Sequence, residues 1–330
     1  MKHTNLWNAV AASAKKGCAA GGIAAALVLT ASAAQAEMDW TESRWGPDDE
    51  IGAANLITPE SVQAAAGLVR TGQTYNLGIV IDSSTPAFPP RSLSIAILQP
   101  NQIGIQGLGP THMTYNDDIF MGWLGIGPQI DGLGHIGIDH VYYNGNIDSD
   151  FAKADGLTHL GIERLPPLVS RGVLLDMAAF YGVEIVPEGT PYTREDIMAA
   201  AEAQGVEIRE GDTVLFHSGW LNLLDGENQD HARYGGTEPG LGKTGAEYLI
   251  EQNVMAVGAD TWGLEAVPFP EGTGVFEVHQ MLIPMNGIFI LETMDTRALA
   301  ADEAWEFMFV LGAARVRGAV QMMINPTAIR

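Results

Sequence analysis

The chain has 330 residues, with 17 lysines and arginines against 40 aspartates and glutamates, and a formal net charge of −23 at pH 7. Phosphate backbones and anionic membrane surfaces attract basic residues, so this balance argues against nucleic acid and anionic lipid as partners. The acidic residues are spread along the chain and do not form consecutive blocks, which indicates a solubilising surface and not an acidic tract.

Residues 1–36 have the pattern of a cleavable signal peptide. Lys15 and Lys16 precede the apolar run "CAAGGIAAALVLTASAA", which ends in Ala-Gln-Ala before Glu37. The run is shorter than the roughly 20 residues that span a bilayer, although an N-terminal membrane anchor is the alternative. We therefore predict a periplasmic protein of residues 37–330, without stable membrane insertion after cleavage. This part has no cysteine, so its fold must depend on its core.

Short segments rich in β-branched and aromatic residues predict strands along the rest of the chain. Helix signals lie between some of them. Thr193 and Asp196 form a capping box at the start of a predicted helix, and Gly205 ends that helix. Thr244 and Glu247 have the same spacing at the start of a second helix. The predicted strands are residues 74–81, 92–98, 119–127, 172–180, 212–220, 254–261 and 287–295, and the predicted helices are 193–205, 244–253, 277–283 ending at Pro284, 164–172 and 296–304.

Strands and helices do not alternate strictly, so we expect a mixed sheet in the α/β or α+β class. Residues 212–261 predict one β-α-β unit. No Pro/Gly/Ser-rich linker divides the chain, which favours one domain over residues 37–330. The long stretches 99–111 and 222–243 are typical of active-site or interface loops.

Several common catalytic arrangements are missing. There is no G-x-S-x-G elbow, no phosphate-binding G-x-x-x-x-G-K-[ST] loop and no H-E-x-x-H. His217 and Ser218 are neighbours on a predicted strand, so their side chains should point to opposite faces. The glycines of "GIGPQIDGLG" lack the spacing of a dinucleotide site. Metal chemistry is what remains.

Two segments carry the candidate ligands. In "QIDGLGH" (129–135), Gln129 and Asp131 are two residues apart and should face the same way on an extended segment. Gly132 and Gly134 permit a turn that brings His135 near Asp131. In the second segment, His279 lies on a predicted helix and Glu292 late in an apolar strand.

A buried Glu292 needs a cation or a donor, and a divalent ion would supply this for Asp131 as well. The alternatives are structural. Asp131 could cap a turn, His279 could be an ordinary helix histidine, and Glu292 could pair with Arg297 or Arg315.

Five segments in this order resemble the cyclase-like metal-dependent hydrolase family, which includes bacterial kynurenine formamidase and isatin hydrolase. The resemblance implies a swivelling β/β/α domain with a mixed central sheet, a homodimer or homotetramer, and hydrolysis of amide C–N bonds in aryl formamides or strained lactams with Zn or Mn. The segments are "QIDGLGH", "GDTVLFHSGW", "GADTWGLEAVP", "VHQMLIPMNGIFILETMD" and "VRGAVQMMINPTAIR".

The family hallmark is H-x-G-T-H-x-D-x-P-x-H, and this chain follows it only in part. Asp131 and His135 match, whereas Gly125 and Gln129 stand where the hallmark has histidines. With the later His279 and Glu292, the resemblance carries over Asp131, His135, His279 and Glu292. Gln129 can offer a neutral amide oxygen in place of a histidine, so we predict Gln129, Asp131, His279 and Glu292 as metal ligands. His135, with an ordinary pKa near 6.5, is the predicted catalytic acid and base. An oxygen-rich set favours Mn²⁺ over Zn²⁺.

His112, Asp117 and Asp118 are further candidates to replace the missing histidines, and a polar turn is their alternative explanation. We expect hydrolysis of a small cyclic or aryl amide by water that the metal activates, with His135 moving the proton. A lyase or dehydratase using the same metal is one alternative, and a non-catalytic periplasmic binding protein is another. Four aromatic residues could line a substrate pocket, although core packing explains each equally well: Phe88, Trp123, Trp220 and Trp262.

Overall fold

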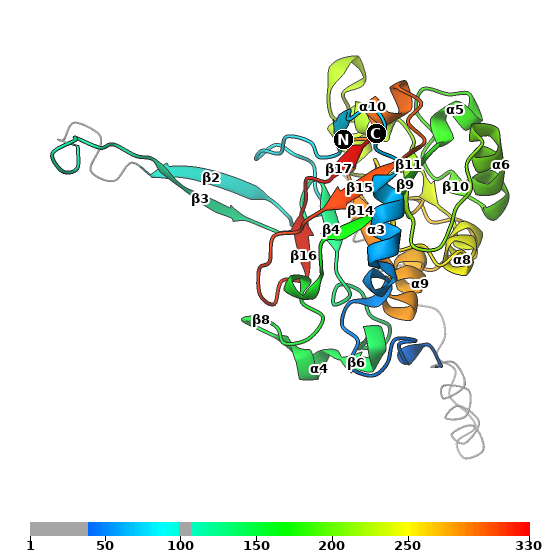
Figure 1. The fold of residues 1–330 in the computed structure, drawn as a ribbon, viewed down its shortest axis with the longest axis horizontal. Coiled ribbons are helices and arrows are strands. Elements are labelled where there is room, and N and C mark those ends of the chain that lie inside the picture. The colour runs from blue at the N-terminus through cyan, green and yellow to red at the C-terminus, as the bar shows by residue number, and fades with distance from the viewer. Residues whose placement is uncertain (1–38, 99–106) are drawn as a thin grey trace, which may run out of the picture.

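The computed structural model describes residues 39–98 and 107–330. The predicted signal peptide at 1–36 and most of the predicted loop at 99–111 therefore lie outside the described residues. Within the described ranges, a nine-stranded sheet forms the body of the molecule, with helices packed around it (Figure 1). No helix in these ranges has both the length and the apolar character needed to cross a bilayer.

The strands of this sheet lie in the order β1-β17-β15-β9-β11-β13-β14-β4-β16. The four central strands β9, β11, β13 and β14 are parallel, and every pairing outside them is antiparallel. This arrangement confirms the predicted mixed sheet and the α/β class. The bounds are β1 (Thr74–Asn76), β4 (Gln129–Asp131), β9 (Leu168–Asp176), β11 (Thr213–His217), β13 (Ala256–Ala259), β14 (Phe289–Glu292), β15 (Glu306–Leu311), β16 (Gln321–Met323) and β17 (Thr327–Ile329).

Helices connect and cover these strands. The α8 helix lies between β11 and β13, which pair in parallel, so the predicted β-α-β unit is confirmed. The helices are α3 (Pro59–Ala66), α4 (Asp148–Phe151), α5 (Met177–Tyr181), α6 (Arg194–Gln204), α7 (His231–Tyr234), α8 (Lys243–Glu251), α9 (Glu277–Asn286) and α10 (Arg297–Ala301). Two-stranded pairs complete the fold: β2 (Leu93–Leu98) with β3 (Asp117–Gly122), β5 (Val141–Tyr142) with β6 (Asn146–Ile147), β7 (Ala152–Lys153) with β8 (Gly156–Leu157), and β10 (Pro191–Tyr192) with β12 (Gly240–Leu241).

The helix signals succeed where capping is local. In α6 the Thr193 side chain accepts the N–H of Asp196, and Gly205 ends the helix at φ 69°. In α8, by contrast, the N-cap is Gly242, and Thr244 is inside the helix, where its hydroxyl oxygen accepts the N–H of Arg194 at 3.3 Å.

The α9 helix does not end at Pro284, as the sequence predicted, but at Gly287, which is left-handed with φ 65°. Pro284 lies in the last turn, where its missing N–H removes one hydrogen bond without ending the helix.

The helix predicted near 164–172 is also wrong, because β9 begins at Leu168 and is paired on both sides. Pairing between distant strands overrides local propensity there. The strand β9 ends at Asp176, whose carboxylate caps α5 by accepting the N–H of Ala179 at 2.8 Å. Two other predicted strands are shorter than expected, because β1 stops at Asn76 and β3 at Gly122.

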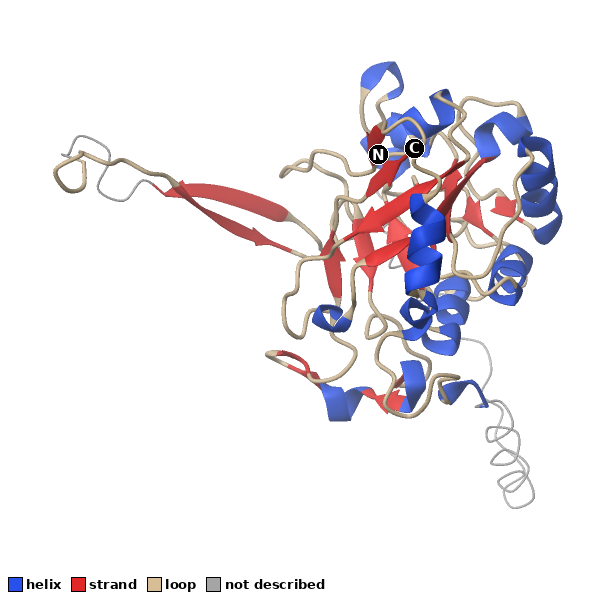
Figure 2. Ribbon diagram, in the orientation of Figure 1, coloured by secondary structure: helices blue, strands red, loops and turns tan. Residues whose placement is uncertain are grey.

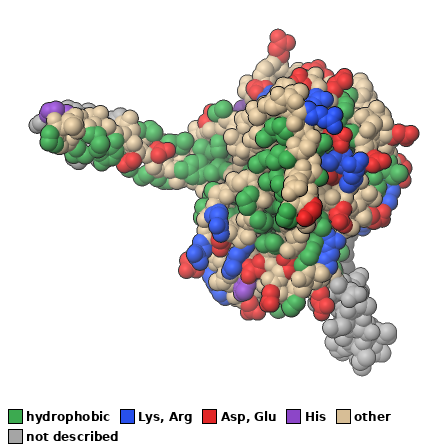
Figure 3. Space-filling view, viewed as in Figure 1, with side chains coloured by type: hydrophobic (Ala, Val, Ile, Leu, Met, Phe, Trp, Pro, Cys, Tyr) green, Lys and Arg blue, Asp and Glu red, His purple; other side chains and the backbone are tan. Residues whose placement is uncertain are grey.

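The β2–β3 hairpin projects away from the body and pairs with no other described strand (Figures 1 and 2). A lone two-stranded hairpin is only marginally stable in water. Apolar side chains cover much of it (Figure 3). The exposed large apolar residues of the hairpin and its base are Ile95, Ile97, Leu98, Leu108, Met113, Ile119, Phe120, Met121 and Trp123.

Candidate metal centre

The register of three strands brings four polar side chains together. In the antiparallel pair β14–β4, Glu292 lies opposite Gln129, and in the pair β4–β16, Asp131 lies opposite Gln321. Residues opposite each other in an antiparallel ladder share one face of the sheet, as do residues two apart on one strand. All four therefore lie on one face, while Ile130 points to the other face and joins the core.

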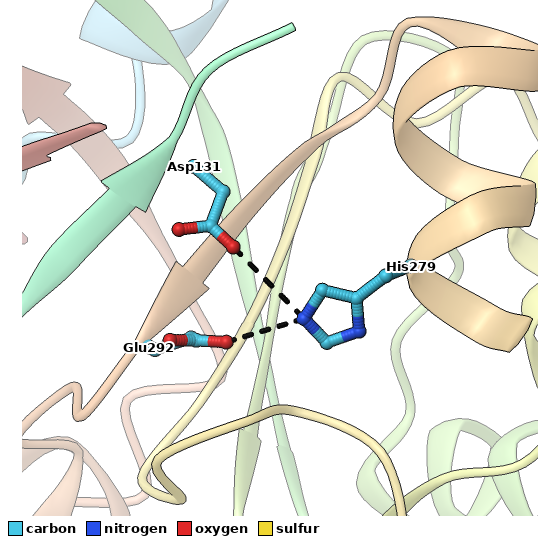
Figure 4. Close-up of side chains that lie close together, drawn as sticks. All are labelled: Asp131, His279 and Glu292. Carbon is cyan, nitrogen blue, oxygen red and sulfur yellow. Dashed lines mark hydrogen bonds and ion pairs between the residues drawn. The ribbon is translucent and has the colours of Figure 1, made fainter. Parts of the chain in front are cut away.

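His279 reaches the same place from α9 (Figure 4). Its Nε2 lies 3.3 Å from Glu292 Oε1 and 3.9 Å from Asp131 Oδ2. One ligand atom from each of the three side chains falls within 4.8 Å of the others, and all three side chains are buried. The structure thus brings together three of the four predicted ligands as a compact triad.

The triad fits a divalent ion. Asp131 Oδ2 is buried and has no hydrogen-bond partner. Such an oxygen is unfavourable in a protein interior unless a cation or donor reaches it. Two carboxylates and one imidazole are ligands that Mn²⁺ and Zn²⁺ both accept.

Glu265 was not identified from the sequence, although it lies in the segment "GADTWGLEAVP". Its Oε1 is 2.6 Å from His279 Nδ1 and also accepts the backbone N–H of His279 at 3.1 Å. A carboxylate on Nδ1 leaves Nε2 free to face the triad, which is the usual support for a metal-binding histidine. The sequence signal that could have identified Glu265 is an acidic residue between apolar neighbours, which is also the signal that identified Glu292.

Burial and charge perturb both ionisable partners in the triad. Burial alone lowers the pKa of His279, but hydrogen bonds with Glu265 and Glu292 outweigh it and raise this pKa to about 10. Burial, reinforced by the charge of Asp131, raises the pKa of Glu292 to about 7. An ion that binds here must therefore displace protons.

Gln129 faces the carboxylates with its nitrogen. Its Nε2 donates to Glu292 Oε2 at 2.5 Å and to Asp131 Oδ1 at 3.2 Å. Its Oε1 accepts from Arg91 Nη1 at 3.5 Å, and a guanidinium can only donate. Gln129 is thus a donor to the cluster in this structure, and its role as a ligand stays a prediction.

His135 lies beside the triad, with Nε2 3.7 Å from Asp131 Oδ2. Its side chain is 20% exposed, compared with 4% for His279. Burial lowers the pKa of His135 and outweighs the opposing effect of Asp131, so the ring is neutral at pH 7. A neutral imidazole in this place is able to accept a proton.

The other candidates do not reach the triad. Asp117 and Asp118 are exposed on the projecting strand β3, and the exposed His112 lies in the segment that precedes it, so the structure does not support them as replacement ligands. Glu292 pairs with neither predicted arginine. Arg297 binds Asp225 and Asp295, and Arg315 donates to the carbonyl oxygen of Glu163.

Three partly exposed aromatic side chains form a series of ring contacts that ends at His279 of the triad. Phe88 stacks on Trp262 with ring centroids 5.7 Å apart, and Phe276 lies edge-on to both Phe88 and His279. Of the other two predicted pocket residues, Trp220 is fully buried in a separate core cluster, and Trp123 is 47% exposed at the base of the hairpin.

Comparison with known proteins supports the same assignment. The model of the cyclase family matches residues 75–266. The chain belongs to the cyclase family. A solved structure described as a novel cyclase is 31% identical to this member, with a TM-score of 0.78 over 87% of this chain and 98% of that one. The search of curated proteins found no match.

Two isatin hydrolases share the fold of this cyclase-family chain at lower identity. One, bound to the product analogue thioisatinate, is 16% identical, with a TM-score of 0.56 over 82% of this chain and 98% of that one. Isatin hydrolase A from Ralstonia solanacearum is 17% identical, with a TM-score of 0.58 over 83% and 98%. The fold expected from the sequence resemblance is therefore confirmed.

This cyclase-family chain also has a cavity of about 720 Å³ away from the triad, lined by Asp225, Asp295 and Arg297 among others. None of the candidate ligands lines it. Three of its charged groups are paired with one another, since Arg297 binds both Asp225 and Asp295. Buried carboxylate oxygens without a hydrogen-bond partner lie instead at Asp131, Glu238 and Asp260, and of these three residues Asp131 belongs to the triad.

Proposed function

We propose that this protein is a metal-dependent hydrolase of cyclic or aryl amides, with Mn²⁺ or Zn²⁺ at the triad. The observation that carries the proposal is the buried Asp131 Oδ2, which accepts no hydrogen bond and lies 3.9 Å from His279 Nε2. When bound, a divalent ion acidifies water and polarises an amide carbonyl. The two carboxylates of the triad favour the harder ion, Mn²⁺.

The chain's own residues supply the remaining steps. Asp131 and Glu292 provide negative charge, and Glu265 keeps the Nδ1 of His279 occupied so that Nε2 faces the site. His135, neutral at pH 7, takes the proton released by the attacking water and returns it to the leaving nitrogen.

The aromatic side chains favour an aromatic substrate. Trp262 and Phe88 present stacked rings, and Phe276 connects them to His279. A flat ring would pack against the partly exposed surfaces of these side chains, with its amide carbonyl directed to the triad. The similarity in fold to an isatin hydrolase bound to thioisatinate agrees with this choice.

Metal removal tests the function. Protein treated with EDTA and dialysed is expected to lose hydrolysis of isatin and N-formylaniline, and to regain it with Mn²⁺ or Zn²⁺. N-methylformamide, which lacks the ring, is the matched substrate and should react at least about tenfold more slowly. Activity that persists after complete chelation contradicts the proposal, and metal binding without turnover indicates a binding protein instead.

We also propose that the hairpin packs against a second copy of the chain. Ile95 lies opposite Phe120 on one face of the ribbon, and both are exposed. Burying each would contribute about 1.5–3 kcal/mol. The double variant Ile95→Asp, Phe120→Asp should therefore be monomeric at concentrations where the native chain is dimeric or larger.

Light scattering during size-exclusion chromatography measures this, with Met198→Asp as the control. Met198 is 50% exposed on α6, away from the hairpin. A native chain that is already monomeric, or a double variant that keeps its oligomeric state, contradicts this proposal.

A further inference from the structure

The side chain of Gln321 fills the space beside Gly125. A Cβ added at Gly125 would lie 2.5 Å from Gln321 Oε1 and 2.7 Å from its Cδ. A side chain at position 125 and Gln321 in its present position therefore exclude each other. Gln321 is 8% exposed and comes from β16, close to the end of the chain.

The nitrogen of Gln321 contacts two members of the site. Nε2 donates to Asp131 Oδ1 at 2.5 Å and lies 3.3 Å from His135 Nε2. Gln129 Nε2 donates to the same oxygen of Asp131 at 3.2 Å. One oxygen of this carboxylate thus has two N–H donors, whereas the other, Oδ2, has none.

We propose that Gln321 is a positioning residue that fixes the rotation of the Asp131 carboxylate and thereby assigns Oδ2 to the metal. The terminal torsion of an aspartate is soft and nearly two-fold, so without donors on one side either oxygen could face the ion. The inference rests on the proposed function, because it requires an ion at the triad.

Gln321 acts through Asp131 and is not itself a ligand. An amide nitrogen has no lone pair to offer, and it is Nε2 that faces the cluster while Oε1 lies against Gly125. The protein then supplies three ligand atoms, from Asp131, His279 and Glu292, and leaves the other coordination positions to water or substrate.

The first test is the affinity of metal-free protein for Mn²⁺, measured by calorimetric titration. Gln321→Leu keeps a side chain of similar size and removes the donor, so the Kd should rise about tenfold or more. Gln73→Leu is the matched control, because Gln73 donates to Asp302 at 2.8 Å through a comparable amide–carboxylate contact away from the triad. The control should leave the Kd unchanged.

The number of coordinated water molecules, measured from the relaxation of water protons by Mn²⁺, separates positioning from ligation. It should be the same in native protein and in Gln321→Leu. Circular dichroism melting curves show whether each variant is folded.

A second variant keeps Gln321 but fills the space beside Gly125 that its side chain occupies. In Gly125→Ala the new methyl group must displace Gln321, so Mn²⁺ affinity should again fall about tenfold. When Gln321→Ala has already opened the space, adding Gly125→Ala should weaken binding less than about twofold, because the two changes act on one contact.

Native affinity in both Gln321→Leu and Gly125→Ala overturns the inference and leaves the hydrolase proposal intact. An additional water molecule in Gln321→Leu also overturns it, because it identifies Gln321 as a ligand. A native protein that binds neither Mn²⁺ nor Zn²⁺ removes the proposed function and this inference together.

Discussion

Replacing Asp131 by Asn is expected to reduce hydrolysis at least about a hundredfold, since metal-ion catalysis supplies several kcal/mol of transition-state stabilisation. The change preserves the size of the side chain and removes one of the two negative charges in the triad. The metal-free protein should respond in the opposite sense. Its buried Oδ2, which accepts no hydrogen bond and whose charge repels that of Glu292, is replaced by a neutral group, and the free energy of unfolding should rise by about 1–3 kcal/mol.

Two measurements check this prediction together. Steady-state hydrolysis with saturating Mn²⁺ reports the loss of activity, and urea unfolding in EDTA reports the gain in stability. Asp155→Asn provides the control for charge removal, because Asp155 is exposed in the turn between β7 and β8. If the variant is less stable than the native chain without metal, Asp131 has a structural role and the reasoning is wrong.

Replacing Glu265 by Gln should weaken Mn²⁺ binding by about 10–100-fold, although Glu265 is not in the triad. Its two oxygens accept from the side chain and backbone of His279 and from the backbone of Val278. A neutral amide oxygen at the place of Oε1 accepts more weakly from His279 than a carboxylate does, and the Val278 N–H loses its acceptor, so the imidazole is held less firmly.

The same change alters the pH dependence of stability. The pKa of His279 in the folded protein is about 10, above its ordinary value of about 6.5. Protonated His279 therefore stabilises the metal-free fold fully below pH ~6.5, and this contribution disappears as the pH rises toward 10. Glu265→Gln should reduce this dependence.

Calorimetric Mn²⁺ titration and melting curves in EDTA between pH 6 and pH 10 measure both effects. Glu303→Gln is a suitable control, because Glu303 is exposed after α10. Unchanged Mn²⁺ affinity in Glu265→Gln would show that His279 is held by other contacts.

Local signals predicted the parts of this fold that depend on neighbouring residues. The α6 helix follows from the capping box at Thr193, and α9 was placed correctly at its start. The end of α9 was predicted wrongly, because a proline ends a helix only where it removes hydrogen bonds that the helix needs. The central strand β9 was partly mistaken for a helix, because its structure depends on pairing with β11 and β15.

The candidate site shows the same division. Asp131, His279 and Glu292 were found from their residue types and from the family resemblance, and the structure brings them together. Gln321 and Glu265 were not found. Gln321 reaches Asp131 only because β16 pairs with β4, a contact across 190 positions that no local pattern reveals.

The edge strand β16 also determines when, during biosynthesis, Asp131 gains its contact with Gln321. β16 contains Gln321 and follows β4 by about 190 residues in the described part of the chain, so β4 is made much earlier. Contacts of such long sequence separation form only after the ends of a large loop meet. The contact between Gln321 and Asp131 therefore forms only once β16 has been made and has paired with β4. The three side chains of the triad all precede β16, so the triad itself can form before Gln321 reaches Asp131. Under the proposed function, an ion that enters before β16 has docked would therefore be held more weakly than one that enters afterwards.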